Sequence, residues 1–394
     1  MSILIHLDRM NHNTLKFDIV ICGAGPAGST CALALGASGL KVALIDKDSF
    51  PREKVCGDAV APYVKKVLNT IHPDYAKALD EFTLKEKVNR IRFVAPNKKK
   101  LDIQFADEGF ISTRLNFDNF LFNLAAKLNN VQVFLNTTVK DVIRIDNGFH
   151  ILRGNNISFE TRMVIGCDGA HSVVNKKLTH TSMDLNHHSG AVRAYYKNVS
   201  GLAPGTFEFH FFKDLLPGYF WIFPLPDNTA NVGLGLLSQN ISNENTNLRN
   251  KMLHIIASEP QLKERFEKAE MISPVKGFGL PLGSRKVSMS GKGFMLCGDA
   301  ASLVDPLSGE GIGEAIVSGR YAGWQAQDCF RKNDFSADCM KDYDEAVYKK
   351  FWQHHLNRYR IRKFINHRAW IINGLVNLAE KNKWFYRRLA KIMS

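Results

Sequence analysis

Short apolar runs alternate with glycine-rich turns in the first part of the sequence. Phe17–Cys22 is an apolar run that ends at Gly23, and we expect it to form a buried parallel strand. Ala27–Gly39 has the pattern of a helix, and Lys41–Asp46 has the pattern of a second buried strand. Together these segments predict a strand–helix–strand unit of about 30 residues.

Further strands and helices are predicted in the same alternating order. We expect a helix from about Asn116 and a hairpin at Asn147-Gly148, because this dipeptide favours the tight turns that join antiparallel strands. Strands are predicted at Val131–Leu135, Val139–Ile145, Met163–Gly166 and Phe294–Cys297.

Residues 190–237 have a different pattern, rich in aromatic and β-branched residues with Pro-Gly turns, which predicts an antiparallel sheet. A helix is predicted over 245–269, and long helices from about residue 310 to the end. The predicted fold class is therefore α/β: a Rossmann-like nucleotide-binding domain, an inserted antiparallel β-sheet substrate domain and a helical C-terminal region. The predicted nucleotide-binding domain comprises residues 1–100, 101–180 and 286–335, the β-rich domain residues 181–285, and the helical, basic region residues 336–394.

Composition places the chain among globular proteins. Hydrophobic residues make up 45% and charged residues 23%, which argues against disorder. The seven cysteines are scattered, with no C-x-x-C pair and no Cys/His cluster, so we expect a reducing compartment and no metal site. No signal peptide and no apolar run of membrane-spanning length are present, which predicts a cytoplasmic protein.

Positive charge is concentrated at the C-terminus. The formal net charge is +14, and residues 341–394 hold 13 Lys/Arg against 4 Asp/Glu, interleaved with aromatic residues. Such helices are typical either of peripheral binding to the inner face of an anionic membrane or of a solvated helix whose aromatic residues pack on the protein body. No nucleic-acid-binding module accompanies the charge, so we expect no nucleic-acid partner.

The segment Gly23-Ala24-Gly25-Pro26-Ala27-Gly28 matches G-x-G-x-x-G between the first strand and the first helix. Gly23, Gly25 and Gly28 suit a tight turn, close approach of the backbone to a pyrophosphate, and close packing of helix on strand. Asp46 ends the second strand, and its spacing from Gly28 is close to that at which a carboxylate binds a ribose hydroxyl. These residues predict a dinucleotide site and leave FAD and NAD open.

Two later motifs resemble known flavoproteins. The first is Gly298–Ala301 followed by Asp305–Gly313, and the second is Gly166–Ser172. Both resemble the FAD-binding signatures of hydroxylases and reductases of the p-hydroxybenzoate hydroxylase type. Many members have Arg shortly after the second motif, where this chain has Asn175.

Two further marks resemble the geranylgeranyl reductase family within that group. They are Phe50–Asp58, directly after the second strand, and Pro217–Pro224 followed by Asn231–Gly235. The second mark resembles the family's Y-x-W-x-F-P substrate segment. One departure is Cys56-Gly57-Asp58, where many of these reductases have C-G-G.

The resemblance implies FAD as cofactor and NAD(P)H as electron donor. It also implies that the cofactor contacts Ala27, Asp46, Lys47, Gly57, Arg114, Val139, Asp168, Asp299, Gly311 and Ile312. Cys56 is the implied proton donor, and the alternative for this residue is a purely structural role. For Arg114 the alternative is an ordinary salt bridge.

The implied reaction is reduction of carbon–carbon double bonds in a prenyl or other unsaturated lipid. Tyr219, Trp221 and Phe223 alternate along one strand, so they share a face that lines either a lipid tunnel or an ordinary sheet core. A monooxygenase or halogenase of the same fold is the main alternative, although Tyr219 and Phe223 replace two residues of the halogenase W-x-W-x-I-P segment. A noncatalytic FAD protein is a third alternative.

Overall fold

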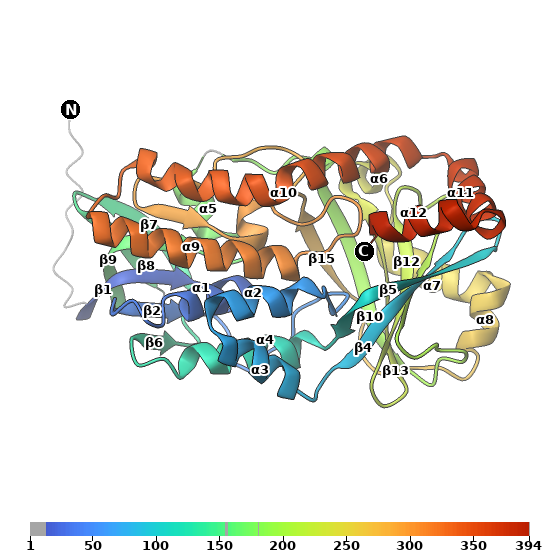
Figure 1. The fold of residues 1–394 in the computed structure, drawn as a ribbon, viewed down its shortest axis with the longest axis horizontal. Helices are drawn as coiled ribbons and strands as arrows, with labels where there is room; N and C mark the ends of the chain where they lie inside the picture. The colour runs from blue at the N-terminus through green and yellow to red at the C-terminus, as the bar shows by residue number, and fades with distance from the viewer. Residues whose placement is uncertain (1–12, 154–156, 180, 394) are drawn as a thin grey trace.

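The computed structural model describes residues 13–153, 157–179 and 181–393. In this part of the chain all seventeen strands belong to two sheets that lie one after the other along the long axis of the molecule (Figure 1). Helices α9, α10, α11 and α12 run along one side of both sheets in Figure 1. The predicted α/β class with a helical C-terminal region is confirmed.

The first sheet has a parallel core in the order β17-β9-β1-β2-β6. Ile19, Val20 and Ile21 of β1 have no exposed surface, which agrees with the apolar run expected of a strand covered on both faces. The hairpin predicted at Asn147-Gly148 joins β7 to β8. The strands of this sheet are β1 (Asn13–Cys22), β2 (Val42–Ile45), β6 (Val131–Phe134), β7 (Val139–Ile145), β8 (Gly148–Arg153), β9 (Ile157–Gly166), β16 (Ser290–Gly291) and β17 (Phe294–Leu296).

Helix α1 packs closely against α9 beside this sheet. A Cβ atom on Gly319 of α9 would lie 2.2 Å from the Ala27 carbonyl oxygen, so only glycine permits this approach. Helix α1 ends at Ala34, whereas the sequence pattern predicts a helix as far as Gly39. The helices of this part are α1 (Pro26–Ala34), α2 (Tyr63–Ile71), α3 (Pro73–Glu81), α4 (Arg114–Ala126), α5 (Val173–Leu178) and α9 (Ile312–Lys332), with the 3-10 turn η2 at Gly298–Ala301.

The second sheet has nine strands and carries the aromatic segment. Its pairing is antiparallel except between β11 and β4, which are parallel. Its strands are β3 (Ala59–Val60), β4 (Glu86–Val94), β5 (Lys100–Ile111), β10 (His188–Lys197), β11 (Thr206–His210), β12 (Tyr219–Leu225), β13 (Thr229–Leu237), β14 (Glu270–Met271) and β15 (Lys276–Pro281).

The predicted division into domains needs one correction. Residues 59–111 are predicted to belong to the nucleotide-binding domain, whereas β3, β4 and β5 pair into the second sheet. The reason is the long-range pairing of β4 with β11, which lies much later in the chain and leaves no local signal in the sequence. The second sheet is therefore assembled from two separate stretches of the chain.

The helix predicted over 245–269 is two helices with a break at Glu259-Pro260. Proline occupies the first turn of α8, where its missing N–H has no partner to lose, and it ends α7 at the preceding turn. Helices α6 (Ser238–Asn243), α7 (Leu248–Ser258) and α8 (Pro260–Phe266) are associated with the second sheet.

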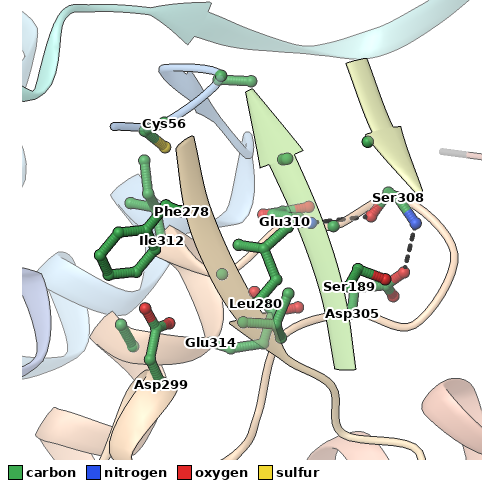
Figure 2. Close-up of a pocket in the computed structure, with 18 of the residues that line it drawn as sticks. Cys56, Ser189, Phe278, Leu280, Asp299, Asp305, Ser308, Glu310, Ile312 and Glu314 are labelled. Atoms are coloured by element: carbon green, nitrogen blue, oxygen red, sulfur yellow. Dashed lines mark hydrogen bonds between the residues drawn. The ribbon is translucent and has the colours of Figure 1, made fainter. Parts of the chain in front are cut away.

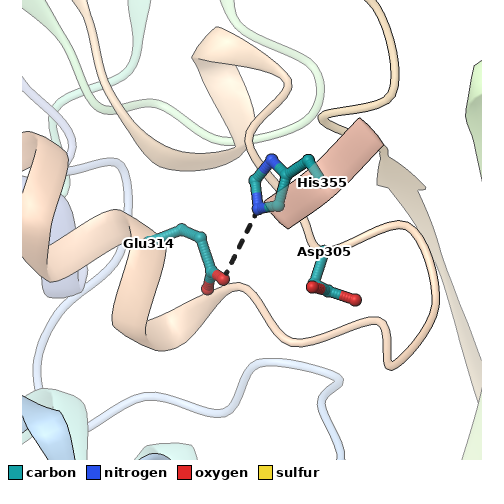
Figure 3. A group of neighbouring side chains, drawn as sticks. All are labelled: Asp305, Glu314 and His355. Atoms are coloured by element: carbon teal, nitrogen blue, oxygen red, sulfur yellow. Dashed lines mark ion pairs between the residues drawn. The ribbon is translucent and has the colours of Figure 1, made fainter. Parts of the chain in front are cut away.

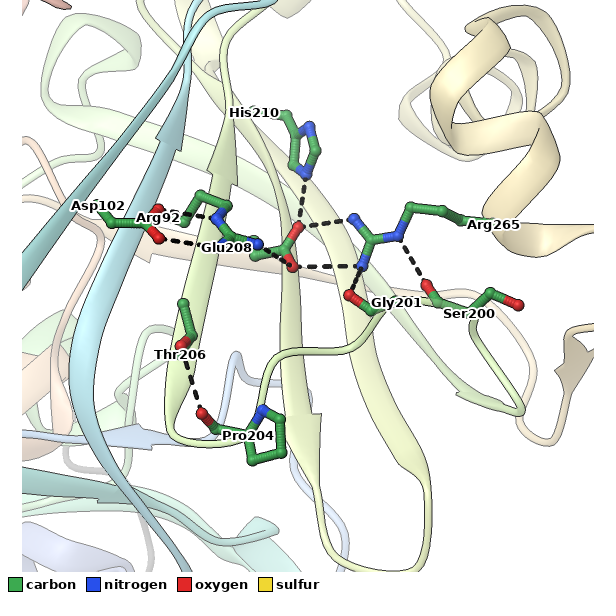
Figure 4. Close-up of polar contacts among 9 residues, drawn as sticks. All are labelled: Arg92, Asp102, Ser200, Gly201, Pro204, Thr206, Glu208, His210 and Arg265. Atoms are coloured by element: carbon green, nitrogen blue, oxygen red, sulfur yellow. Dashed lines mark hydrogen bonds and ion pairs between the residues drawn. The ribbon is translucent and has the colours of Figure 1, made fainter. Parts of the chain in front are cut away.

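The buried carboxylate of Glu208 holds the C-terminal end of α8 against the second sheet (Figure 4). Glu208 of β11 accepts hydrogen bonds from Arg265 at 2.7 and 3.3 Å and lies 3.3 Å from His210 Nε2. Burial raises the pKa of Glu208, but the bonds from His210 and Arg265 outweigh it and lower that pKa to about 2. The charge is therefore retained inside the protein and paired.

The C-terminal region consists of three helices. They are α10 (Ala337–Ile365), α11 (Ala369–Lys381) and α12 (Lys383–Met393). Helix α10 packs on α9, whereas α11 and α12 pack on β5 of the second sheet (Figure 1). None of the helices in the described residues is long and apolar enough to span a membrane.

Candidate active site

One continuous cavity of about 1320 Å³ lies between the two sheets and the C-terminal helices. With one exception, it is lined by every residue that is predicted above to bind the cofactor or the substrate or to act in catalysis. The exception is Gly28. A Cβ atom there would lie 1.7 Å from the Gly23 carbonyl oxygen, so Gly28 closes the turn beneath the cavity.

The glycine turn opens one end of the cavity at the N-terminus of α1. A Cβ atom on Gly25 would meet only the Arg52 guanidinium within 4 Å, so the backbone of this residue is open toward the cavity. The N-terminus of a helix offers free N–H groups and a positive dipole end, both suited to phosphate. Arg52 adds a cation, and it lies 3.3 Å from the Asp118 carboxylate.

Asp46 lies beside this turn, as the spacing predicts. Its carboxylate accepts hydrogen bonds from the backbone N–H groups of Ala24 at 2.8 Å and Asp48 at 3.0 Å. Two carboxylate oxygens can accept about four hydrogen bonds, so two sites remain for ribose hydroxyls. Lys47 and Val139 line the same end of the cavity.

The late turn, from β17 to α9, forms a second wall. Gly311 is the N-cap of α9 and Ile312 its first residue, so this helix also directs its N-terminus at the cavity. Asp299 lies in η2, and its carboxylate is 3.1 Å from Lys54 Nζ. Figure 2 shows Asp299, Ile312 and Cys56 arranged around the same space.

This arrangement fits FAD. Two helix N-termini suit the pyrophosphate and the pyrimidine carbonyls, and the acceptors Asp46 and Asp299 suit the ribose and ribityl hydroxyls. Arg52 and Lys54 are not among the cofactor residues predicted from the sequence. The sequence feature that could have indicated them is a pair of basic residues in the Phe50–Asp58 segment, directly after the second strand.

Two residues assigned to the cofactor are engaged in contacts within the protein. Asp168 accepts hydrogen bonds from Ser172 Oγ at 2.5 Å and Val173 N at 2.7 Å, so it caps α5. Arg114 forms a two-pronged ion pair with Asp118, with N–O distances of 2.6 and 2.8 Å. Both line the cavity, and their contacts with a cofactor remain predictions.

Cys56 lies where the polar end of the cavity meets its aromatic wall. The Arg114 guanidinium lies near the Cys56 side chain and interacts with it electrostatically. The Asn231 side chain donates 2.8 Å hydrogen bonds to the Cys56 carbonyl oxygen and to Asp58 Oδ2. The loop that carries the cysteine is therefore held from the second sheet.

Tyr219, Trp221 and Phe223 share one face of β12, and all three line the cavity. Trp221 Nε1 donates a 2.9 Å hydrogen bond to Asn231 Oδ1, and the Tyr219 hydroxyl bonds to the Ser308 carbonyl oxygen. The aromatic wall is thereby connected to the Cys56 loop on one side and to the late turn on the other.

Beyond the aromatic wall the cavity continues between the second sheet and the C-terminal helices. Its lining there contains many apolar side chains from β5, β11, α10, α11 and α12: Leu101, Phe105, Phe209, Phe211, Ile361, Ile365, Ile372, Leu375, Val376 and Leu389. The same β5 and α10 also contribute polar lining residues: Asp107, Lys350, His354, Arg358 and Arg362. The apolar part of this lining suits a hydrocarbon chain.

Asp305, Glu314 and His355 form a buried group at the edge of the cavity, with possible ligand atoms within 4.8 Å of one another (Figure 3). Asp305 Oδ1 accepts hydrogen bonds from two backbone N–H groups of the late turn, and Oδ2 lies 3.4 Å from Arg358 Nε. These contacts account for Asp305 without a metal. Burial raises the pKa of Glu314 and lowers that of His355, so both favour their neutral forms.

Comparison with known proteins agrees with this geometry. Residues 16–344 match a family model described as FAD binding domain. The chain is also 31% identical over 356 residues to digeranylgeranylglycerophospholipid reductase from Thermoplasma volcanium, which covers 87% of this chain and 86% of the relative. The chain belongs to the geranylgeranyl reductase family of FAD-binding proteins.

Other members and neighbours extend this result. A geranylgeranyl diphosphate reductase of Rhodobacter capsulatus is 31% identical, over 82% of this chain and 78% of the relative. The crystal structure of a geranylgeranyl bacteriochlorophyll reductase-like protein from Thermoplasma acidophilum is similar with a TM-score of 0.81 at 28% identity, over 93% of this chain and 91% of that chain. The flavin-dependent brominase Bmp2, at 20% identity and a TM-score of 0.73, shares the fold, over 95% of this chain and 93% of that chain. As a member of the reductase family, the chain is an FAD-dependent oxidoreductase.

Proposed function

We propose that this oxidoreductase saturates carbon–carbon double bonds of a prenyl chain. The observation that carries the proposal is the continuity of the cavity from the FAD-binding turns, past Cys56, into an apolar channel. The names of the two reductase relatives, digeranylgeranylglycerophospholipid reductase and geranylgeranyl diphosphate reductase, support a polyprenyl chain as the substrate class.

Reduced FAD, held by the two helix N-termini with Asp46 and Asp299, would supply hydride for one alkene carbon, and NAD(P)H is the proposed source of the electrons. The other alkene carbon must receive a proton, because an isolated double bond is a poor hydride acceptor. In this proposal the Cys56 thiol donates that proton. The neighbouring Arg114 guanidinium stabilises the thiolate that remains, and hydride plus proton account for the two hydrogens added.

Other residues orient the substrate and exclude water. Asn231 holds the backbone of the Cys56 loop and the Trp221 indole at the same time, which fixes the distance between the acid and the aromatic wall. The wall of Tyr219, Trp221 and Phe223 then positions the prenyl chain and keeps the site dry.

The test is anaerobic reoxidation of the dithionite-reduced holoenzyme by geranylgeranyl diphosphate, followed through the flavin absorbance and by mass spectrometry of the product. Wild-type protein is expected to reoxidise and to yield products heavier by two hydrogens per reduced bond. Cys56→Ser is expected to retain FAD and to react about a hundredfold more slowly, since proton donation contributes at least that factor.

Cys167→Ser is the matched control, because Cys167 lines the cofactor end of the same cavity. Its reoxidation rate is expected to stay within about twofold of wild type. Reoxidation that requires oxygen and yields a hydroxylated or halogenated product contradicts the proposal and favours a monooxygenase or halogenase. Failure of any prenyl compound to change the flavin favours the noncatalytic alternative.

A further inference from the structure

Helix α11 carries three exposed large apolar side chains, which is unusual for one helix on a protein surface. Trp370, Leu375 and Leu378 are 70%, 39% and 46% exposed. On its inner face the helix buries a second set of apolar side chains: Ile371, Ile372, Val376 and Ala379. Packing on the second sheet accounts for the buried set and does not account for the three exposed side chains.

The apolar surface continues onto the two neighbouring helices. We call it the C-terminal apolar face, and it comprises Ile361, Phe364, Trp370, Leu375, Leu378 and Trp384. These six are among thirteen exposed large apolar side chains in the described part of the chain, and no other member of that set lies C-terminal to Trp324. Scattered exposed apolar residues are normal, whereas a concentration of this kind marks an interaction site.

Basic side chains surround this face. Within residues 360–388 seven exposed residues are positively charged: Arg360, Lys363, Arg368, Lys381, Lys383, Arg387 and Arg388. The one acidic residue in this range, Glu380, is paired with Lys99 at 2.7 Å. Tryptophan and basic residues together suit the boundary between the headgroups and hydrocarbon of an anionic bilayer.

The cavity reaches this face. Ile361 of α10 and Leu375 of α11 are 44% and 39% exposed, and both also line the cavity that contains Cys56. These two side chains therefore belong both to the cavity lining and to the C-terminal apolar face. A lipid chain that leaves a bilayer at this point follows the apolar side chains of the cavity lining toward the cofactor end.

We propose that the C-terminal apolar face binds the surface of an anionic lipid bilayer and that a membrane lipid inserts its prenyl chain past Ile361 and Leu375. The bilayer-binding part stands on the exposed face and its charge. The entry route rests on the proposed function, since it requires a lipid substrate. Amphipathic, basic helices of this kind lie in the plane of the membrane interface rather than crossing it.

The test uses the full-length FAD-bound protein and vesicles of phosphatidylglycerol or phosphatidylcholine, with cosedimentation and tryptophan fluorescence as readouts. Wild-type protein is expected to bind phosphatidylglycerol vesicles, with a blue shift of tryptophan emission, and to bind phosphatidylcholine much less. Arg387→Gln/Arg388→Gln is expected to bind phosphatidylglycerol about thirtyfold more weakly, from about 1 kcal/mol for each charge near the surface.

Trp370→Ser/Leu378→Ser removes apolar contact and leaves the charge unchanged, and we expect binding about tenfold weaker and a smaller blue shift. Trp324→Ser is the matched control, because Trp324 is 37% exposed on α9, outside the C-terminal apolar face. This variant is expected to bind phosphatidylglycerol vesicles as tightly as wild type. Equal binding by wild type and Trp370→Ser/Leu378→Ser overturns the proposal. The proposal is also overturned if wild-type protein does not bind the vesicles and is a dimer, while Trp370→Ser/Leu378→Ser is a monomer. In that case a second copy of the chain covers the face.

The entry route is tested separately by presenting one prenyl lipid in phosphatidylglycerol vesicles and in detergent micelles. In micelles, Trp370→Ser/Leu378→Ser is expected to reduce the lipid at the same rate as wild type. In vesicles its rate of lipid reduction is expected to be lower by the same factor as its vesicle binding. Equal rates in vesicles overturn the entry route. If wild-type protein reduces no lipid in either form, the proposed function fails, while the sedimentation result still decides whether the face binds membranes.

Discussion

At the scale of single residues, the departure from C-G-G at Asp58 has a structural explanation. The backbone of Asp58 has φ +66°, in the left-handed region that glycine, asparagine and aspartate tolerate best. Its carboxylate accepts hydrogen bonds from the Tyr195 hydroxyl at 2.7 Å and from Asn231 at 2.8 Å. Asp58 therefore keeps the turn that glycine would allow, and it fastens the Cys56 loop to β10 and β13.

Asp58→Asn is expected to change the dependence of stability on pH. Burial raises the pKa of Asp58 to about 6 against the lowering effect of Tyr195 and Asn231, whereas the unfolded chain has the ordinary value near 4. Between these values the folded protein keeps a proton that the unfolded chain loses, so wild-type stability falls relative to the variant as pH rises from 4 to 7. The difference in free energy of unfolding between wild type and Asp58→Asn is expected to change by about 3 kcal/mol across this pH range, as measured by urea unfolding.

Asp342→Asn serves as the control, because Asp342 is exposed, and the stability difference between this variant and wild type should stay flat over the same range. A flat difference for Asp58→Asn as well contradicts a neutral, buried Asp58 carboxyl.

At the scale of elements, two helix N-termini and the strand ends beside them create the cofactor site. The βαβ unit was predictable because local signals specify it: apolar runs, glycines at fixed offsets and an acid at a strand end. The late turn was predicted from its resemblance to a flavoprotein signature. The place of β4 and β5 was not predictable, since their pairing with β11 depends on residues far away in the chain. The contact of Arg114 with Cys56 is of the same kind, because it joins the start of α4 to a loop that precedes β3, β4 and β5.

Asp299→Ala is expected to purify folded but with little or no FAD. The change removes the acceptor that faces the cavity from η2 and leaves Lys54 without its carboxylate partner. The flavin content is read from the visible absorbance per mole of protein, with circular dichroism to check folding. Asp299→Asn keeps one acceptor oxygen and should retain more FAD than Asp299→Ala; full FAD content in Asp299→Ala removes the proposed role.

Glu208→Gln is expected to weaken the attachment of α8 to the second sheet. Loss of this charge leaves Arg265 and His210 without their buried partner, for an expected destabilisation of about 3 kcal/mol at pH 7. Because the pKa of Glu208 is lowered to about 2, its stabilisation is complete above about pH 5 and disappears as pH falls toward 2. Chemical unfolding of wild type and Glu208→Gln at pH 7 and at pH 3 measures the stability difference at each pH.

The exposed Glu270 provides the control, and Glu270→Gln should leave stability within about 0.5 kcal/mol of wild type. A pH-independent loss in Glu208→Gln indicates that packing, rather than the paired charge, holds α8.

At the scale of the whole molecule, the cavity runs through parts that the sequence predicts as separate domains. Its cofactor end belongs to the first sheet, its aromatic wall to the second, and its far end to α10, α11 and α12. The alternation Tyr219, Trp221 and Phe223 indicated a shared face, but only the packing of the C-terminal helices makes that face one wall of a channel. The length of the cavity is thus set by all three parts together.

Ile372→Phe is expected to shorten the channel. Ile372 lines its far end, so the larger ring should reduce kcat/KM for geranylgeranyl diphosphate about tenfold and leave geranyl diphosphate nearly unchanged. Ile371→Phe is the matched control, because Ile371 is equally buried on α11 but does not line the cavity. If Ile372→Phe lowers kcat/KM equally for both diphosphates, the variant acts through stability instead. The same conclusion follows if Ile371→Phe shows the same preference between the two diphosphates as Ile372→Phe.

The chain passes between the two sheets four times, because β3–β5 and β10–β15 are each inserted between strands of the first sheet. A hinge motion that opens a cleft between two lobes needs a few connecting segments that bend together, and four widely separated crossings resist such bending. Under the proposed function, a long prenyl substrate is therefore expected to enter at the exposed edge of the cavity, at Ile361 and Leu375, rather than through a cleft that opens between the two sheets.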